Sequence, residues 1–129
     1  GIDEILAFLH ERKIKSAVAT ATPIELALQY LGRIGVKDQF DRIVSAKQVA
    51  HGKPAPDVYL YACGQIGEDP ADCVAVEDSP NGIRAAYAAG CRPVMVPDLT
   101  QPDEEIRPLL YAVVDTLADI KGLIPDRTL

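Results

Sequence analysis

The stretch VAVEDSPNGI, residues 74–83, combines a short apolar run, two adjacent acids and a helix start. The apolar residues have the length of a strand, and Glu77 and Asp78 follow them directly. Ser79 is a favoured N-cap residue, the proline after it suits the first helical position, and Gly82 permits a close backbone approach. Open α/β sheets bind their ligands at the carboxyl ends of the strands. The stretch therefore predicts a strand–turn–helix unit with an acidic pair at a ligand-binding edge.

Apolar runs of strand length alternate with segments of helical periodicity on both sides of this unit. Strands are expected at residues 16–20, 42–45, 73–76, 92–96 and 112–114. Helices are expected at residues 2–12, 23–31, 56–66, 80–89 and 115–123, with a short one at 104–110. The strand runs are continuously apolar, which is typical of a parallel sheet covered on both faces. The predicted fold is a doubly wound α/β domain.

Composition limits the partners and the compartment. The chain has 129 residues, which is the size of one domain with a real core. A net charge of −6 argues against nucleic-acid binding and favours small-molecule partners. Three cysteines without CxxC spacing favour free thiols in a reducing compartment. Because the sequence shows neither a leader pattern nor a long apolar run that would point to a membrane, the expected location is cytoplasmic.

Three residues are predicted to lie together at the carboxyl edge of the sheet. Thr20 ends the first strand, Lys53 lies in a proline-stiffened loop before a helix, and Asp78 follows a later strand. A right-handed crossover returns the chain to the same edge, so these side chains should face one crevice. Thr20 and the Ala21 backbone can bind phosphate oxygens, and Lys53 is a point charge suited to a phosphoryl group. Asp78, with Glu77 directly or through water, offers ligands for Mg²⁺.

Each of these signals also has a purely structural interpretation. A threonine at a strand end can be a cap, a lysine can be a solvated surface residue, and acids before a helix complement its dipole. Only their combination and order predict a phosphoryl-binding site. Asp57 is either a helix cap or a support for Lys53. Residues assigned to possible substrate contact or to a supporting shell are Thr22, Asp57, Ser79 and Asn81.

Three segments resemble motifs two, three and four of the haloacid dehalogenase (HAD) superfamily, in its β-phosphoglucomutase and phosphoglycolate-phosphatase-like branch. They are AVATAT at 17–22, GKPAPD at 52–57 and VEDSPNGI at 76–83, and the resemblance covers about residues 1–97. It implies a Rossmann-like, three-layer α/β/α parallel sheet. It also implies an Mg²⁺-dependent phosphatase or phosphomutase that acts on a small phosphorylated metabolite through an aspartyl-phosphate.

The resemblance assigns a role to each candidate residue. Thr20 would hydrogen-bond the transferring phosphoryl group, and Lys53 would stabilise the charge of the phosphorylated intermediate. Asp78 with Glu77 would hold Mg²⁺. The substrate is not implied, because the cap domain selects it in this family.

One part of the family's pattern has no counterpart in these 129 residues. The nucleophile of the family lies in an Asp-x-Asp motif on the first strand, and no Asp-x-Asp occurs here. Residues 1–129 are therefore expected to be a partial core without motif one or the cap, and to be inactive alone. In the family the absent strand is central, between the strands at 16–20 and 74–77. Those two strands should flank an empty slot, pair directly, or accept a strand from an N-terminal segment of the same protein or from another chain.

Two noncatalytic alternatives stay open. A doubly wound binding or regulatory domain, such as a flavodoxin or a phospho-receiver, would have the same pattern of elements. A receiver needs a phosphorylatable Asp after an acidic pair, and a flavodoxin needs an early phosphate loop that residues 20–22 imitate faintly. A short protein that works as a noncatalytic partner would keep the acid pair for structural reasons only.

Overall fold

The computed structural model describes residues 2–97 and 101–124, in which helices and parallel strands alternate. The α-helices in these ranges are α1 (Ile2–Glu11), α2 (Ile24–Arg33), α3 (Asp57–Ile66) and α4 (Pro80–Ala89). The strands are β1 (Ala17–Thr20), β2 (Arg42–Ser45), β3 (Val74–Glu77), β4 (Arg92–Met95) and β5 (Ala112–Val113). Short 3₁₀ helices are η1 (Lys37–Gln39), η2 (Ala46–Gln48), η3 (Pro70–Asp72), η4 (Arg107–Leu109) and η5 (Leu117–Leu123).

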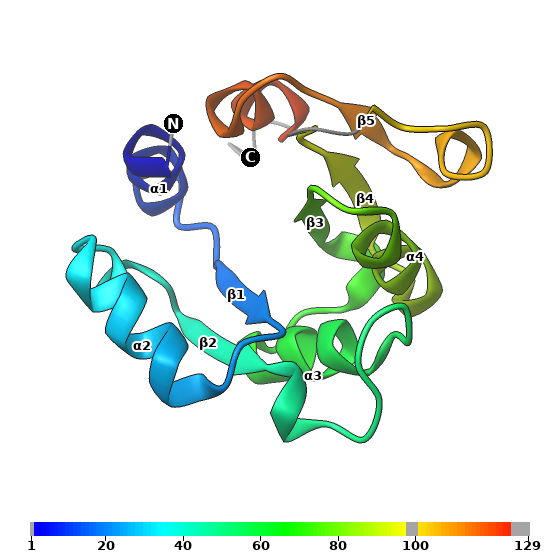
Figure 1. Cartoon of the computed structure of the whole chain (residues 1–129). Coiled ribbons are helices and arrows are strands. Elements are labelled where there is room, and N and C mark those ends of the chain that lie inside the picture. The colour runs from blue at the N-terminus through cyan, green and yellow to red at the C-terminus, as the bar shows by residue number, and fades with distance from the viewer. Residues whose placement is uncertain (1, 98–100, 125–129) are drawn as a thin grey trace.

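The strands form two parallel sheets rather than one. β1 pairs with β2 in one sheet, and β3, β4 and β5 form the other in that order. Figure 1 shows β1 and β3 apart from each other, each with only one side of its ladder paired within the described residues. The α/β fold with parallel strands is confirmed. Of the three arrangements expected for β1 and β3, the structure has the one in which they flank a slot.

A groove of about 610 Å³ occupies this slot. Its walls come from α1, β1, α3, β3 and η5, and most of the lining side chains are apolar. The hydroxyl of Ser16, just before β1, lines the groove and is buried without a hydrogen-bond partner among the described residues. The inner edges of β1 and β3 therefore face a space that no described segment fills.

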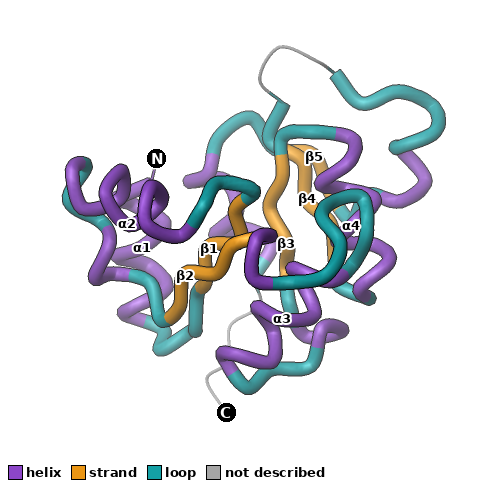
Figure 2. Tube along the Cα trace, turned by 60° about the horizontal axis from the view of Figure 1, so that its bottom comes forward, coloured by secondary structure: helices purple, strands orange, loops and turns teal. Residues whose placement is uncertain are grey.

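Helix α3 is the element that holds the two sheets together. It packs on both β1 and β2 and also contacts α4. Val58, Tyr59 and Ala62 of this helix share a buried cluster with Val44 of β2 and Ala75 of β3. Figure 2 shows the strands of the two sheets separately, with α3 below them. Burial along one helix thus positions the strand ends from both sheets relative to each other.

Other helices cover the remaining faces of the sheets. α1 packs on η5, and Ile5 of α1 shares a buried cluster with Val94 of β4 and Ile120 of η5. α2 contacts β2 and lies across the β1–β2 sheet from α3 (Figure 1). The helical layers on both sides of the strands agree with the expected three-layer arrangement.

Local sequence signals explain most of the element boundaries. The Ser79 hydroxyl accepts a hydrogen bond from the Gly82 amide and caps α4, as predicted. Gly67 and Gly90 end α3 and α4 with φ of 69° and 91°, a conformation that glycine adopts without strain. No helix within the described ranges is long and apolar enough to cross a membrane.

Two predicted helices near the carboxyl end are wrong in type. The helix expected at 104–110 is a turn followed by the 3₁₀ helix η4. Pro108 lies within this segment and lacks a backbone donor, which interrupts an α-helical ladder. The helix expected at 115–123 is the 3₁₀ helix η5, with Thr116 and Asp119 forming a capping box at its start.

Candidate active site

A pocket of about 580 Å³ opens at the carboxyl ends of β1, β3 and β4. The predicted residues that line it are Thr20, Ala21, Lys53, Glu77 and Asp78. Val96 and Pro97, which follow β4, complete one wall, and Leu117 of η5 adds to the lining. The structure therefore brings the predicted phosphate-binding and acidic residues into one crevice.

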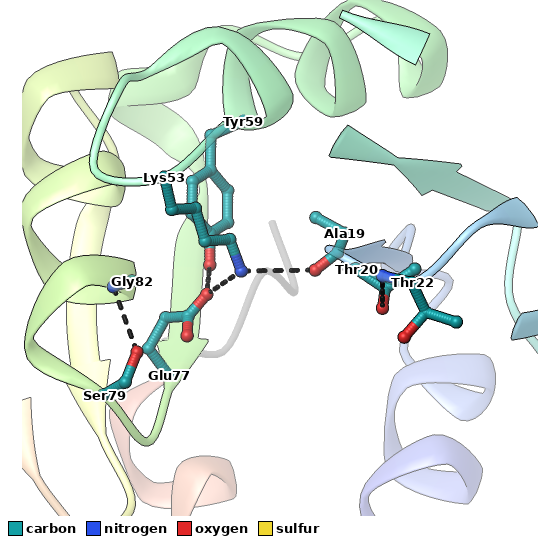
Figure 3. A network of polar contacts seen from close by, with 8 residues as sticks. All are labelled: Ala19, Thr20, Thr22, Lys53, Tyr59, Glu77, Ser79 and Gly82. Carbon is teal, nitrogen blue, oxygen red and sulfur yellow. Dashed lines mark hydrogen bonds and ion pairs between the residues drawn. The ribbon is translucent and has the colours of Figure 1, made fainter. Parts of the chain in front are cut away.

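Lys53 is held between the two sheets by long-range contacts. Its Nζ donates to Glu77 Oε2 at 2.5 Å and lies 3.4 Å from the backbone oxygen of Ala19. The exposed fractions of the two charged side chains are 18% for Lys53 and 9% for Glu77. Figure 3 shows the ammonium group between the end of β3 and the end of β1. The lysine is thus a partly buried cation with a fixed direction rather than a solvated surface residue.

Tyr59 completes this network from the first turn of α3. Its hydroxyl donates to the same Glu77 Oε2 that accepts from Lys53, and its ring centroid lies 5.2 Å from Lys53 Nζ. The residue is buried, with 8% of its surface exposed. Burial raises the pKa of the Tyr59 hydroxyl, and the Glu77 carboxylate raises it further. The phenol is therefore a neutral hydrogen-bond donor across the ordinary pH range.

Gly82 makes room for the Glu77 carboxylate at the start of α4. A Cβ atom on Gly82 would overlap Oε1 and Cδ of Glu77. The carboxylate thus has Lys53 and Tyr59 at one oxygen and the Gly82 backbone against the other. The close approach predicted for this glycine is made to the neighbouring acid within the chain.

The β1 side of the crevice is built mostly from local contacts. The Thr20 hydroxyl accepts from the Thr22 amide at 3.1 Å, which closes a short turn after β1. The Ser45 hydroxyl, fully buried at the end of β2, donates to the Thr22 backbone oxygen at 2.6 Å. Thr22 itself is exposed and does not line the pocket. Its backbone holds the turn in which Thr20 and Ala21 lie.

Asp57 ties the lysine loop to α3. Its Oδ2 accepts from the His51 backbone amide at 3.1 Å and lies 3.2 Å from His51 Nδ1. Asp57 is the first residue of α3, whereas Pro56 is in the N-cap position and makes no side-chain cap bond. Of the two roles considered for Asp57, these contacts favour support of the loop that carries Lys53.

Among the described residues of the crevice, the acid that remains free to meet a ligand is Asp78. It follows β3 directly, it is exposed, and it lines the pocket. Ser79 is used as the α4 cap, and Asn81 is exposed on α4 outside the pocket lining. Neither of these two residues joins the crevice in the described structure.

The donor set of the crevice fits one kind of metal site only. Within residues 2–97 and 101–124 no three His, Cys, Asp or Glu side chains gather as a metal cluster. Mg²⁺, however, commonly binds through one or two carboxylates and takes its other ligands from water and phosphate. Asp78 can supply such a carboxylate, and the Glu77 carboxylate lies beside it but is bonded to Lys53 and Tyr59. The residues therefore fit a solvated Mg²⁺ ion and not a closed protein cage.

Two residues of this site were missed from the sequence. Ser45 ends β2 at the same edge as Thr20, so its position after an apolar run was a usable signal. Tyr59 gave no such signal, because a tyrosine on a helical face is ordinarily a core residue. Its role depends on the packing of α3 against β3.

Comparisons with known proteins agree with this geometry. The family model described as haloacid dehalogenase-like hydrolase matches residues 1–90. Hexitol phosphatase B of Escherichia coli is 37% identical over 97 residues, which are 75% of this chain and 44% of that protein. The phosphorylated carbohydrates phosphatase of Thermotoga maritima is 35% identical over 124 residues, 96% of this chain and 50% of that protein.

Solved structures give the same result. The crystal structure of CbbY from Rhodobacter sphaeroides in complex with phosphate superposes with a TM-score of 0.83 at 32% identity, covering 93% of this chain and 54% of that one. The chain spans about half the length of the relatives that it matches. With parallel sheets, the three motifs in one crevice and a family model over most of its length, the chain belongs to the haloacid dehalogenase-like hydrolase family.

Proposed function

We propose that this chain is the core of an Mg²⁺-dependent phosphatase or phosphomutase that acts on a small phosphorylated carbohydrate. One observation carries the proposal: the Lys53 ammonium is fixed at the mouth of a pocket that also holds the exposed carboxylate of Asp78. A directed cation beside a free acid is the arrangement that a metal-bound phosphoryl group requires. The carbohydrate class follows the relatives named for hexitol and phosphorylated-carbohydrate phosphatases.

The proposed roles follow from position and charge. Lys53 and the turn of Thr20 and Ala21 hold the phosphoryl oxygens from opposite sides of the crevice. Asp78 would hold Mg²⁺, with Glu77 as a neighbouring acid, and the ion would supply positive charge to the phosphoryl group. Thr22 and Asp57 support the two loops, and Ser79 and Asn81 belong to the first turns of α4. A noncatalytic binding domain has no need of the buried ion pair beside the free acid.

The nucleophile is proposed to come from a strand that occupies the groove between β1 and β3. The unpaired inner edges of both strands and the buried Ser16 hydroxyl support this proposal. An aspartate at the end of such a strand would attack phosphorus. An oxygen–phosphorus bond to the carboxylate would form, and the bond to the sugar oxygen, which takes up a proton, would break. Water would then hydrolyse the aspartyl-phosphate in a phosphatase. In a mutase, a second sugar hydroxyl would accept the phosphoryl group and free the aspartate.

Domain organisation and location are parts of the same proposal. Residues 1–129 form the portion of the core with motifs two to four, and the segment that fills the groove belongs to the same protein or to another chain. The cap that selects the sugar lies outside this portion. The cysteines of the described structure are unpaired, which supports a reducing, cytoplasmic compartment.

A phosphatase assay with a panel of sugar phosphates tests the proposal. The purified chain alone is expected to be inactive with Mg²⁺. Addition of a short β-strand peptide that ends in Asp-x-Asp, or covalent fusion of that strand ahead of Ile2, is expected to give metal-dependent turnover. Asp78→Ala should abolish this turnover, whereas Asp38→Ala, at an exposed acid that lines neither the pocket nor the groove, should not. Turnover by the unsupplemented chain that Asp78→Ala abolishes would overturn the proposed need for a strand.

A further inference from the structure

The first turn of α3 contacts Lys53 directly through Tyr59 and contacts the loop that carries it through Asp57. Asp57 accepts from the His51 amide and so fixes the backbone of the loop that carries the lysine. Two residues later, Tyr59 places its ring beneath the lysine head group, with the centroid 5.2 Å from Nζ. One helix turn therefore fixes both the backbone of the lysine loop and the position of the ammonium group.

Tyr59 also contacts the counter-ion of that lysine. Its hydroxyl donates to Glu77 Oε2, the oxygen that Lys53 approaches at 2.5 Å. The other carboxylate oxygen lies against the Gly82 backbone, where a Cβ atom has no room. The carboxylate thus has little freedom to rotate away from the lysine.

The ring is a rigid support because it belongs to the core. Tyr59 is 8% exposed and packs in the buried cluster that includes Ala75 of β3 and Cys91, the residue before β4. A tyrosine side chain has two rotatable torsions, so burial of the ring fixes the hydroxyl. The ion pair, by contrast, is formed by two long and flexible side chains.

We infer that Tyr59 is a positioning residue that keeps Glu77 paired with Lys53 and directs the lysine ammonium across the crevice toward the end of β1. The inference rests on the proposed function only for its purpose, because the contacts themselves are present in this chain. The ring and the hydroxyl have separate tasks. The ring supports the ammonium through its π face, and the hydroxyl holds the carboxylate.

As a consequence, the two adjacent acids have different roles. Tyr59 and Lys53 hold Glu77, which leaves Asp78 as the acid whose side chain is exposed to the pocket. Removal of the Tyr59 hydroxyl should loosen Glu77 and allow the lysine to leave its place beside Ala19. The fold should persist, since phenylalanine fills the same buried volume.

The ¹⁵N-edited NMR signal of the Lys53 ammonium tests this inference on the chain itself, without an activity assay. Its assignment comes from its loss in Lys53→Arg. An ammonium held in a shielded ion pair exchanges its protons slowly with water, and that rate is the readout. Tyr59→Phe is expected to raise the exchange rate about tenfold, as expected for loss of a hydrogen bond to a charged group. Tyr59→Leu, which also removes the ring, should eliminate the signal.

Tyr61→Phe is the matched control. Tyr61 lies on the same helix, and its hydroxyl makes no hydrogen bond within the described structure. This variant should leave the Lys53 signal unchanged, and backbone amide shifts remote from the crevice should be conserved in all variants. A Lys53 signal that is the same in Tyr59→Phe and wild type would overturn the inference.

The activity assay separates this inference from the proposed function. In the strand-completed enzyme, Tyr59→Phe should lower kcat about tenfold and change KM less than about twofold. If the wild-type protein has no turnover but its Lys53 signal depends on Tyr59, the proposed function fails and the positioning role stands. Unchanged kcat in Tyr59→Phe, with turnover in the wild type, contradicts the positioning role and leaves the proposed function intact.

Discussion

The two sides of the crevice are built in different ways. The β3 side, defined as Lys53, Tyr59, Glu77 and Gly82, is a buried network whose members come from a loop, α3, β3 and α4. The β1 side is the exposed turn after β1, closed by its own hydroxyl and tied to β2 through Ser45. The lysine contact to Ala19 joins the two sides across the slot. The charged β3 side is thus fixed by contacts between distant parts of the fold, whereas the β1 side is held by one bond within its own turn and one bond to the end of β2.

The largest expected effect comes from breaking the ion pair on the β3 side. Glu77→Ala removes the carboxylate partner of Lys53, whose side chain is 18% exposed in the intact pair. We expect the free energy of unfolding to fall by about 3 kcal/mol, because a largely buried charge loses its compensation. Urea unfolding measures this change. Asp78→Ala, at the exposed neighbour, should change stability by less than about 0.5 kcal/mol, and equal losses in the two variants would contradict the comparison.

Gly82→Ala tests the packing of the same carboxylate. The added methyl overlaps Glu77 and forces its side chain away from Lys53 and Tyr59, so we expect a loss of about 2 kcal/mol. Gly64→Ala is a matched control, since a Cβ there meets open space within α3. It should stabilise the protein by about 0.5–1 kcal/mol through helix propensity. The midpoint temperatures of thermal unfolding should therefore shift in opposite directions in the two variants. An unchanged midpoint in Gly82→Ala would show that the Glu77 side chain is not constrained.

A smaller effect is expected on the β1 side. Ser45→Ala removes the buried hydroxyl that donates to the Thr22 oxygen and accepts from the Lys47 amide. We expect a loss of about 1 kcal/mol, the usual net value of a hydrogen bond. Thr20→Ala should cost less than this, because its bond lies within a partly exposed turn. If urea unfolding showed that Thr20→Ala lowers the free energy of unfolding by several kcal/mol, the β1 side would be as tightly fixed as the β3 side.

The effect that matters least near neutral pH is a pH dependence from the thiols beneath the β3 side. Burial, together with the nearby Cys91 thiol, raises the pKa of Cys63 from 9.0 to about 11. A raised pKa in the folded state means that the unfolded chain loses its thiol proton first as pH increases. Stability from this group is therefore complete below pH 9 and declines between pH 9 and about 11. Urea unfolding at several pH values should show a smaller decline in stability for Cys63→Ala than for the wild type. An identical decline in the two proteins would show that the Cys63 thiol is not its source.

The sequence was informative where a short segment determines its own structure. The α4 start, the alternation of strands and helices and the five residues of the crevice could be predicted from caps, apolar runs and the crossover rule. The pairing of Glu77 with Lys53 could not be predicted, because it depends on how α3 packs against β3. For the same reason the sequence placed Glu77 with the metal, whereas the structure shows it bonded to lysine and tyrosine. Its possible role at the metal stays a prediction.

The carboxyl-terminal elements show the opposite case. Apolar spacing at 104–110 and 115–123 predicted α-helices, but both segments are short and contain a proline or a glycine. Spacing alone does not distinguish a 3₁₀ helix from an α-helix over two turns. The apolar spacing did predict which side chains pack inward: those of the first segment pack on β4 and α4, and those of η5 pack on β4 and α1.

The most direct test of the account is an NMR titration of the chain with Mg²⁺ and inorganic phosphate. We predict shifts confined to the amides of the Thr20–Thr22 turn, to the Lys53 ammonium and to the residues around Asp78. Mg²⁺ binding should be weak, because the described part of the crevice offers one free carboxylate, and Asp78→Ala should eliminate the Mg²⁺-dependent shifts. Shifts centred elsewhere, or tight Mg²⁺ binding that persists in Asp78→Ala, would contradict the claim that this crevice is a phosphoryl-transfer site.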